Sequence, residues 1–273
     1  MAYKVLKNIV YTKTEQEPLT ADVYLPETGE GHPMVIMVHG GAFHTGAKEM
    51  YQAWGPYLAA NGIAAIAINY RLATLEQASY PGVLQDMEDA VSYVVANANA
   101  WNVEPTKIGF MGDSAGAYLG TMAAFGSERA SSKICFVICA YGVMNIIDWA
   151  QYTNATRTDY VVNKLFGQDC ATGRYRYMAG CPLHKIDQAV RNPFFKTAFY
   201  MIWGDQDDTV LPEHQTLAFI EKLKKYQIPH QTLCVKNQGH FWFTRNDNLS
   251  SCELEGAVKE IAPEVLAFIR SVV

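Results

Sequence analysis

A serine stands between two glycines in the run Gly112-Asp113-Ser114-Ala115-Gly116. This Gly-x-Ser-x-Gly spacing is typical of a nucleophile on a sharp strand-to-helix turn, because glycines two positions either side remove side chains that would clash there. An apolar run, residues 108–111, precedes the motif, and small residues follow it. The pattern predicts Ser114 as a nucleophile at the start of a helix, whose N-terminus favours developing negative charge. The alternative is a tight turn with an incidental serine.

A glycine-rich loop, His39-Gly40-Gly41-Ala42-Phe43, follows another apolar run at residues 34–38. Attack on a carbonyl produces a tetrahedral oxyanion, which needs two or more fixed N–H donors, and glycines let the backbone approach closely. We expect the backbone N–H groups of Gly41, Ala42 and Ala115 to be these donors. His39 is interpreted as a residue that orients the loop, and the alternative for the glycines is an ordinary turn at a strand end.

A serine nucleophile of this kind is followed along the chain first by an acid and then by a histidine base. His240 lies in a glycine-bearing loop, residues 237–242, after the last apolar run, and it is the predicted base. The other histidines after Ser114 lie in less suitable places, namely a polar segment, a helix start and a strand entry: His184, His214 and His230.

Three carboxylates compete for the role of the acid, because the run at residues 198–203 ends in Gly204-Asp205-Gln206-Asp207-Asp208. The chain must turn before a side chain can point back to the histidine, which favours Asp207 over Asp205. Asp208 would face away or cap the next helix. Asp207 would hold the His240 ring in one tautomer and stabilise the imidazolium.

The elements that must position these residues alternate along the chain. Apolar runs short enough to be buried strands lie at residues 34–38, 63–68, 108–111, 134–139 and 198–203, with a weaker one at 231–235. Helical spacing joins Leu84, Met87, Val91 and Val94, and later Leu217, Ile220 and Leu223. This alternation predicts an α/β fold with a mostly parallel central sheet flanked by helices. Residues 19–25, between two prolines, are predicted to form an antiparallel edge strand.

One segment, residues 145–193, is polar and aromatic and shows no clean strand. A stretch this long without regular structure inside a domain is usually functional. We therefore interpret it as a small lid-like insertion in a single domain spanning residues 1–273. The alternative is a set of short surface helices packed by their own aromatic rings.

Charge and hydropathy narrow the function classes. The net charge of −5 comes without a basic run, which argues against nucleic acid or an anionic membrane as a partner. No apolar stretch reaches the roughly 18 residues that a membrane helix needs. The N-terminal residues lack the pattern of a signal peptide. A cytoplasmic protein is expected, and a secreted protein whose signal was removed stays open.

The six cysteines form no Cys-x-x-Cys pair and stand at no zinc-ligand spacing with histidine, so no metal is expected. They are Cys135, Cys139, Cys170, Cys181, Cys234 and Cys252. Cys170 and Cys181 lie in the irregular segment and could bridge in an oxidising compartment. The default expectation is reduced thiols.

Taken together, these motifs resemble the α/β-hydrolase carboxylesterases of the hormone-sensitive-lipase-like group, nearest to the acetyl xylan and feruloyl esterase branch. The likeness covers nearly the whole chain. It is carried by Ala21-Asp22-Val23-Tyr24-Leu25-Pro26, the His39–Phe43 loop, Asn69-Tyr70-Arg71-Leu72, Tyr80-Pro81, the Ser114 motif, Gly204-x-x-Asp207-x-x-Val210 and Gly239-His240. The chain departs from the group at Ala42 and Ala117, where glycine is common, and at Asn69, where aspartate is common.

The resemblance implies an α/β-hydrolase fold and a serine esterase acting on short- to medium-chain acyl or aryl esters, among them carbohydrate-linked acetyl or feruloyl esters. It implies no cofactor and a small-molecule ester as the partner, and it leaves a homodimer open. Candidate pocket walls are Phe43, Trp149, Tyr152 and Trp242, with plain core packing as the alternative. An amidase, arylformamidase or peptidase would share the same residues. A catalytically silent binding protein is a further alternative.

Overall fold

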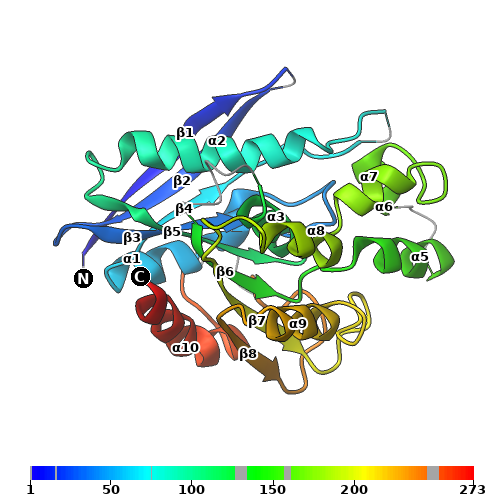
Figure 1. Ribbon diagram of the computed structural model, residues 1–273. Helices are drawn as coiled ribbons and strands as arrows, with labels where there is room; N and C mark the ends of the chain where they lie inside the picture. Colours follow the sequence, from blue (N-terminus) through cyan, green and yellow to red (C-terminus); the bar gives the residue numbers. More distant parts are fainter. Residues whose placement is uncertain (1, 16, 75, 127–133, 157–160, 245–251) are drawn as a thin grey trace.

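The structure, a computed structural model, describes residues 2–15, 17–74, 76–126, 134–156, 161–244 and 252–273. Its strands form one sheet in the order β1-β2-β4-β3-β5-β6-β7-β8 (Figure 1). They are β1 (Tyr3–Lys13), β2 (Pro18–Pro26), β3 (His32–Val38), β4 (Ala64–Ile68), β5 (Val103–Asp113), β6 (Ile134–Ala140), β7 (Ala198–Gly204) and β8 (His230–Val235). The six strands from β3 to β8 are parallel, whereas β1 and β2 are antiparallel to their neighbours.

Helices bury both faces of this sheet. Side chains alternate along β3, so that Met34 and Ile36 join one hydrophobic cluster while Val35 and Met37 join the other. The first cluster includes α2 (Gly82–Asn97), α3 (Ala115–Ala124), α8 (Pro182–Ala189) and α9 (Thr216–Lys225). The second includes α1 (Trp54–Ala60) and α10 (Gly256–Val272). Burial on both faces explains why the parallel strands read as continuous apolar runs.

The six apolar runs are β3 to β8, and the two helical patterns lie in α2 and α9, so these predictions are confirmed. The prediction that residues 19–25 form an edge strand is wrong in one respect. This strand, β2, is antiparallel, but it lies between β1 and β4, and β1 is the edge. The sequence hides β1 because exposed Lys4 and Lys7 and two register shifts break its alternation.

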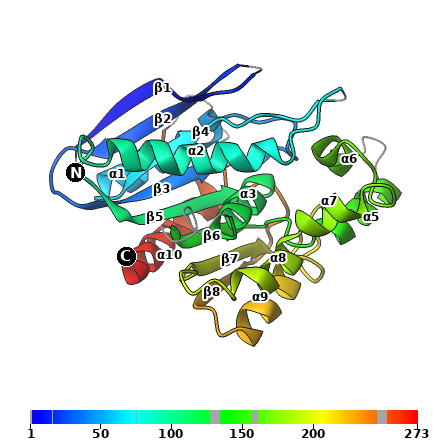
Figure 2. The same cartoon turned by 45° about the horizontal axis from the view of Figure 1, so that its top comes forward.

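The segment 145–193 contains helices and, among its described residues, no strand. They are α5 (Ile146–Thr156), α6 (Val161–Phe166), α7 (Arg174–Ala179) and α8. In both views α5, α6 and α7 lie together beyond one end of the sheet (Figures 1 and 2). The Phe166 ring packs against Tyr80 at 4.8 Å and Tyr177 at 4.2 Å between centroids. The segment is thus a group of short helices packed in part by aromatic rings, and its role as a lid stays a prediction.

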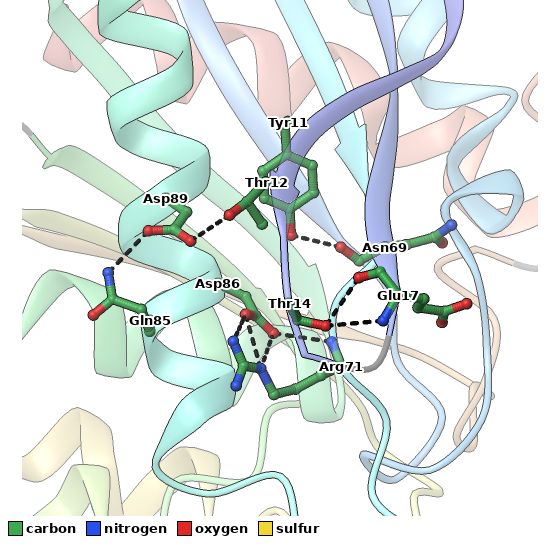
Figure 3. A network of polar contacts seen from close by, with 9 residues as sticks. All are labelled: Tyr11, Thr12, Thr14, Glu17, Asn69, Arg71, Gln85, Asp86 and Asp89. Atoms are coloured by element: carbon green, nitrogen blue, oxygen red, sulfur yellow. Dashed lines mark hydrogen bonds and ion pairs between the residues drawn. The ribbon is translucent and has the colours of Figure 1, made fainter.

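An ion pair between the partly exposed Arg71 and the buried Asp86 fixes the chain between the sheet and α2. Asp86 is fully buried on α2 and accepts hydrogen bonds from Arg71 Nε at 2.9 Å, Nη2 at 2.5 Å and the backbone N–H at 2.9 Å. Figure 3 shows this pair beside the hydrogen bond from the Tyr11 hydroxyl to the Asn69 carbonyl. A buried carboxylate needs such partners, and here they hold the segment that follows β4 in one conformation.

None of the helices in the described part of the chain is long and apolar enough to cross a membrane.

Candidate active site

Ser114 lies where β5 ends and α3 begins, with φ +50° and ψ −114°. A non-glycine residue in this left-handed region is strained, and such strain is typical of a nucleophile at a strand-to-helix turn. The surrounding glycines permit the turn: a Cβ at Gly112 would overlap the backbone of Gly116, and a Cβ at Gly116 would overlap the Val38 carbonyl. The sequence motif therefore adopts the predicted geometry.

Three predicted residues meet in one hydrogen-bonded chain. The Ser114 hydroxyl lies 3.0 Å from His240 Nε2, and His240 Nδ1–H donates to Asp207 Oδ2 at 2.7 Å. The side chains of His240 and Asp207 are only 2% and 0% exposed. Because an ionised carboxylate only accepts, Asp207 fixes the proton on Nδ1 and leaves Nε2 to accept the serine proton.

Asp207 is the one of the three competing carboxylates that reaches His240. Its second oxygen, Oδ1, accepts the backbone N–H groups of Thr209 at 3.0 Å and Val210 at 2.9 Å. Asp205 instead accepts the backbone N–H of Asn237 at 2.7 Å, at the start of the loop that carries His240. The sequence did not reveal this second function of the aspartate cluster.

His39 makes contacts that suit a residue that orients its own loop. Its Nδ1–H donates to the Gly40 carbonyl at 2.7 Å, and its ring stacks on Tyr70 at 4.3 Å between centroids. Burial lowers the pKa of His39 to about 4, so the ring is neutral. His214 pairs with Asp148 at 3.1 Å instead of approaching Ser114.

The loop after β3 has an unusual backbone at three consecutive residues. Gly41, Ala42 and Phe43 have φ values of +111°, +51° and +68°, and the Gly41 carbonyl accepts from the Thr45 N–H at 3.0 Å. Within the described part of the chain, the N–H groups of Gly41, Ala42 and Ala115 donate to no protein acceptor. A tight loop with unused donors suits an anion, and their role in an oxyanion hole stays a prediction.

Asp113, which precedes Ser114, joins three segments of the site. Its Oδ1 accepts the Gly40 N–H at 2.9 Å and the Tyr51 hydroxyl at 3.1 Å, and its Oδ2 lies 3.4 Å from the Thr244 hydroxyl. Tyr51 ends the short helix η1 (Lys48–Tyr51). Burial raises the pKa of Asp113 to about 6 in spite of these hydrogen bonds. In the sequence, the position next to Ser114 is the one feature that sets Asp113 apart from the other aspartates.

Aromatic rings surround the hydrogen-bonded chain. Phe43 is fully buried and contacts Trp149, with ring centroids 6.5 Å apart. The sequence did not identify Tyr141 and Phe241, whose rings each lie 4.4 Å from the His240 ring, and Phe241 is 59% exposed. Whether the predicted wall residues Phe43, Trp149, Tyr152 and Trp242 contact a substrate stays a prediction.

The cysteines and the possible metal ligands are the other groups that could carry chemistry. Cys170 and Cys181 are both free thiols. Among the residues that the structure describes, no three His, Cys, Asp or Glu side chains are grouped so that they could hold a metal ion.

A profile of the family described as BD-FAE matches residues 21–223, well over half of the chain. The chain belongs to the BD-FAE family. The match spans Ser114, Asp207 and the loop at residues 39–43, and the resemblance that the sequence motifs predicted is thereby confirmed.

Curated relatives share part of this BD-FAE chain. A protein of Arabidopsis thaliana named "Probable isoprenylcysteine alpha-carbonyl methylesterase ICMEL2" is 33% identical over 131 residues, which are 48% of the chain and 30% of the relative. The "Probable carboxylic ester hydrolase LipM" of Mycobacterium tuberculosis is 24% identical over 203 residues, which are 71% of the chain and 45% of the relative. The chain thus spans less than half the length of these two relatives.

Solved structures share the fold of this BD-FAE protein over nearly its whole length. Esterase B from Lactobacillus rhamnosis has a TM-score of 0.77 at 18% identity, covering 99% of this chain and 87% of the esterase. A truncated carbohydrate esterase from gut microbiota has a TM-score of 0.74 at 21% identity, and the match covers 98% of this chain and 96% of the esterase. With the sheet order described above, these matches confirm the predicted α/β-hydrolase fold.

The raised pKa of Asp113 predicts a pH-dependent stability. The pKa moves from 3.8 to about 6, so the folded chain keeps a proton that the unfolded chain releases between these values. The free energy of unfolding should therefore fall as the pH rises through this window, by about 3 kcal/mol from this group.

Asp113→Asn lacks this titration, and urea unfolding of both proteins between about pH 4 and about pH 7 measures the difference. Wild type should lose stability relative to Asp113→Asn as the pH rises, while the exposed control Glu221→Gln should parallel wild type. A constant difference between wild type and Asp113→Asn would contradict the assignment.

Proposed function

We propose that this protein is a serine carboxylesterase whose catalytic residues are Ser114, His240 and Asp207. The observation that carries the proposal is the buried hydrogen-bonded chain from the Ser114 hydroxyl through both nitrogens of His240 to Asp207. A nucleophile, a base and an orienting acid in this order are what acyl transfer requires. The names of the curated relatives, a methylesterase and a carboxylic ester hydrolase, support the same reaction class.

In the first half of the reaction, His240 Nε2 takes the proton of Ser114 while the serine oxygen attacks the ester carbonyl. The carbonyl oxygen becomes an oxyanion and accepts hydrogen bonds from the N–H groups of Gly41, Ala42 and Ala115. Asp207 stabilises the imidazolium. The proton then passes from His240 to the leaving alcohol, the C–O bond to that alcohol breaks, and an acyl-serine remains.

In the second half, His240 takes a proton from water, whose oxygen attacks the acyl-serine. The same N–H donors stabilise the second oxyanion, and the serine oxygen leaves with the proton from His240. The acid is released and Ser114 is restored. The reaction uses side chains and backbone of this chain alone and needs no cofactor.

The substrate class we propose is a short- to medium-chain acyl or aryl ester, including carbohydrate-linked acetyl or feruloyl esters. Structural neighbours described as a carbohydrate esterase and as an acetyl ester-xyloside bifunctional hydrolase support this class. We propose that Phe43, Trp149, Tyr152 and Trp242 form pocket walls, with the exposed Phe241 ring beside His240 as a further contact.

Labelling tests the nucleophile directly. A fluorophosphonate should modify the native protein at Ser114, because His240 activates that hydroxyl, and Ser114→Ala should not be labelled. Intact-mass spectrometry with peptide mapping measures the adduct, and Ser127→Ala serves as a control that should label as wild type does. Absence of labelling in the native protein, or equal labelling of Ser114→Ala, rejects the esterase proposal.

Substitution of the acid tests the role of its charge. Asp207→Asn should lower kcat by about 10⁴, because an amide no longer holds His240 in the required tautomer. Asp205→Asn should lose much less, since Asp205 holds the backbone of Asn237 and does not touch the imidazole. Initial rates on p-nitrophenyl acetate compare the two. A large loss in Asp205→Asn with near-normal Asp207→Asn would show that the acid is assigned wrongly.

A substrate series tests the acyl preference. Initial rates on p-nitrophenyl esters from acetate to decanoate, with acetylated xylan and methyl ferulate, should be highest for the shorter acyl groups or the carbohydrate and aryl esters. A preference for acyl chains above about eight carbons would contradict the proposed class, because such chains need a long apolar pocket. A matching p-nitroanilide should react far more slowly, and the reverse order would indicate an amidase.

A further inference from the structure

Helix α5 of the insertion is hydrogen-bonded to the loop that carries Asp207. The Trp149 indole Nε1–H donates to the Thr209 carbonyl at 2.9 Å, and the Tyr152 hydroxyl donates to the Asp208 carbonyl at 2.6 Å. Trp149 is 3% exposed, so its hydrogen bond is shielded from water. Both acceptors lie within two residues of the acid.

The same helix is also joined to the far end of this loop. Gln215, which is 1% exposed, accepts the backbone N–H of Asn145 at 2.7 Å and donates to the Asn145 carbonyl at 3.1 Å. Asp148, in the first turn of α5, pairs with His214 at 3.1 Å. Helix α5 and Asn145, the residue before it, therefore hold the loop at residues 208–209 and again at 214–215. A shift of α5 would strain or break these contacts unless the loop moved with the helix.

The two carbonyls that α5 contacts belong to the same peptide groups as the two N–H groups that donate to Asp207. The Asp208 carbonyl and the Thr209 N–H belong to one peptide group, and the Thr209 carbonyl and the Val210 N–H belong to the next. A trans peptide is planar, with its C=O and N–H pointing in opposite directions. Each carbonyl bound by α5 therefore directs the N–H on its other side, and both N–H groups donate to Asp207 Oδ1.

Two parallel relays result. One runs from the Tyr152 hydroxyl through the 208–209 peptide to Asp207, and the other runs from the Trp149 indole through the 209–210 peptide to the same oxygen. A donor bound to a carbonyl polarises the peptide and strengthens the hydrogen bond that its N–H donates. The other oxygen of Asp207 remains directed at His240 Nδ1–H.

We propose that Trp149 and Tyr152 are positioning residues that act through these two peptide groups to hold the Asp207 carboxylate against His240. The inference rests on the proposed function only in so far as Asp207 serves catalysis. The insertion thereby acquires a role in the chemistry itself, separate from any role as a lid. Trp149 also contacts Phe43 of the proposed oxyanion loop at residues 39–43. One side chain therefore contacts both that loop and the loop that carries Asp207.

Conservative variants test the proposal. Tyr152→Phe removes the hydroxyl alone, and Trp149→Phe removes the indole N–H while keeping an aromatic ring beside Phe43. The matched control is Tyr226→Phe. It loses a hydroxyl hydrogen bond of 2.7 Å to Asp187, which does not involve the loop that carries Asp207. Two quantities are measured: kcat and KM on p-nitrophenyl acetate, and the low-field proton resonance of His240 Nδ1–H.

The double variant should lose on the order of 10- to 100-fold in kcat, because a small displacement of a catalytic group carries a large kinetic cost. KM should change by less than about threefold, since each variant keeps an aromatic ring at its place in the proposed pocket wall. The Nδ1–H resonance should move upfield or broaden. Tyr226→Phe should keep the kcat and the resonance of wild type.

Unchanged kcat and an unchanged resonance in the double variant would overturn the proposal, as would an equal loss in Tyr226→Phe. If the double variant fails to fold by circular dichroism, Tyr152→Phe alone decides by the same two readouts. The resonance also separates this proposal from the proposed function. A wild type that fluorophosphonate does not label rejects the esterase, whereas a resonance that moves in the variants still supports the relay to Asp207.

Discussion

The site depends on one close backbone approach, between the start of α3 and the end of β3. Gly116 has no side chain, and only for that reason can it lie against the Val38 carbonyl. This approach places the start of α3 against the beginning of the loop at residues 39–43, where Asp113 accepts the Gly40 N–H. The strained φ of Ser114 is kept because this contact holds α3 against β3, while β5, on the other side of the turn, is paired with β3 in the sheet.

What the sequence could predict follows from how local each signal is. The parallel strands were predictable because burial on both faces makes each a continuous apolar run, whereas β1, a polar edge strand with register shifts, gave no such signal. Ser114, Asp207 and His240 were predicted from their places after the apolar runs that form β5, β7 and β8. The hydrogen bonds from Gly40 to Asp113 and from Asn237 to Asp205 span 73 and 32 residues, so no local pattern could indicate them.

The aromatic residues of the insertion show how one helix can serve two surroundings. Trp149 and Tyr152 are three residues apart and share one face of α5, directed at the loop that carries Asp207. Ile147, Gln151 and Asn154, spaced four and three apart, line a cavity with α7 and His184. The sequence indicated pocket walls because aromatic rings are large and apolar, but Tyr and Trp also carry a polar hydrogen that seeks an acceptor when buried. Backbone carbonyls of the facing loop satisfy it here.

The two buried carboxylates of the site, Asp113 and Asp207, differ in their hydrogen-bond partners, and this difference separates what each does in the structure. Asp207 receives two backbone N–H groups on one oxygen and the imidazole N–H on the other, so its charge faces the ring that becomes cationic in the proposed mechanism. Asp113 receives only neutral donors, and burial raises its pKa to about 6. A carboxyl that is costly to ionise, and whose hydrogen bonds go to Gly40, Tyr51 and Thr244, can still order the backbone. Asp113 therefore fastens the loop at residues 39–43 to the turn at Ser114, while Asp207 contacts the His240 imidazole.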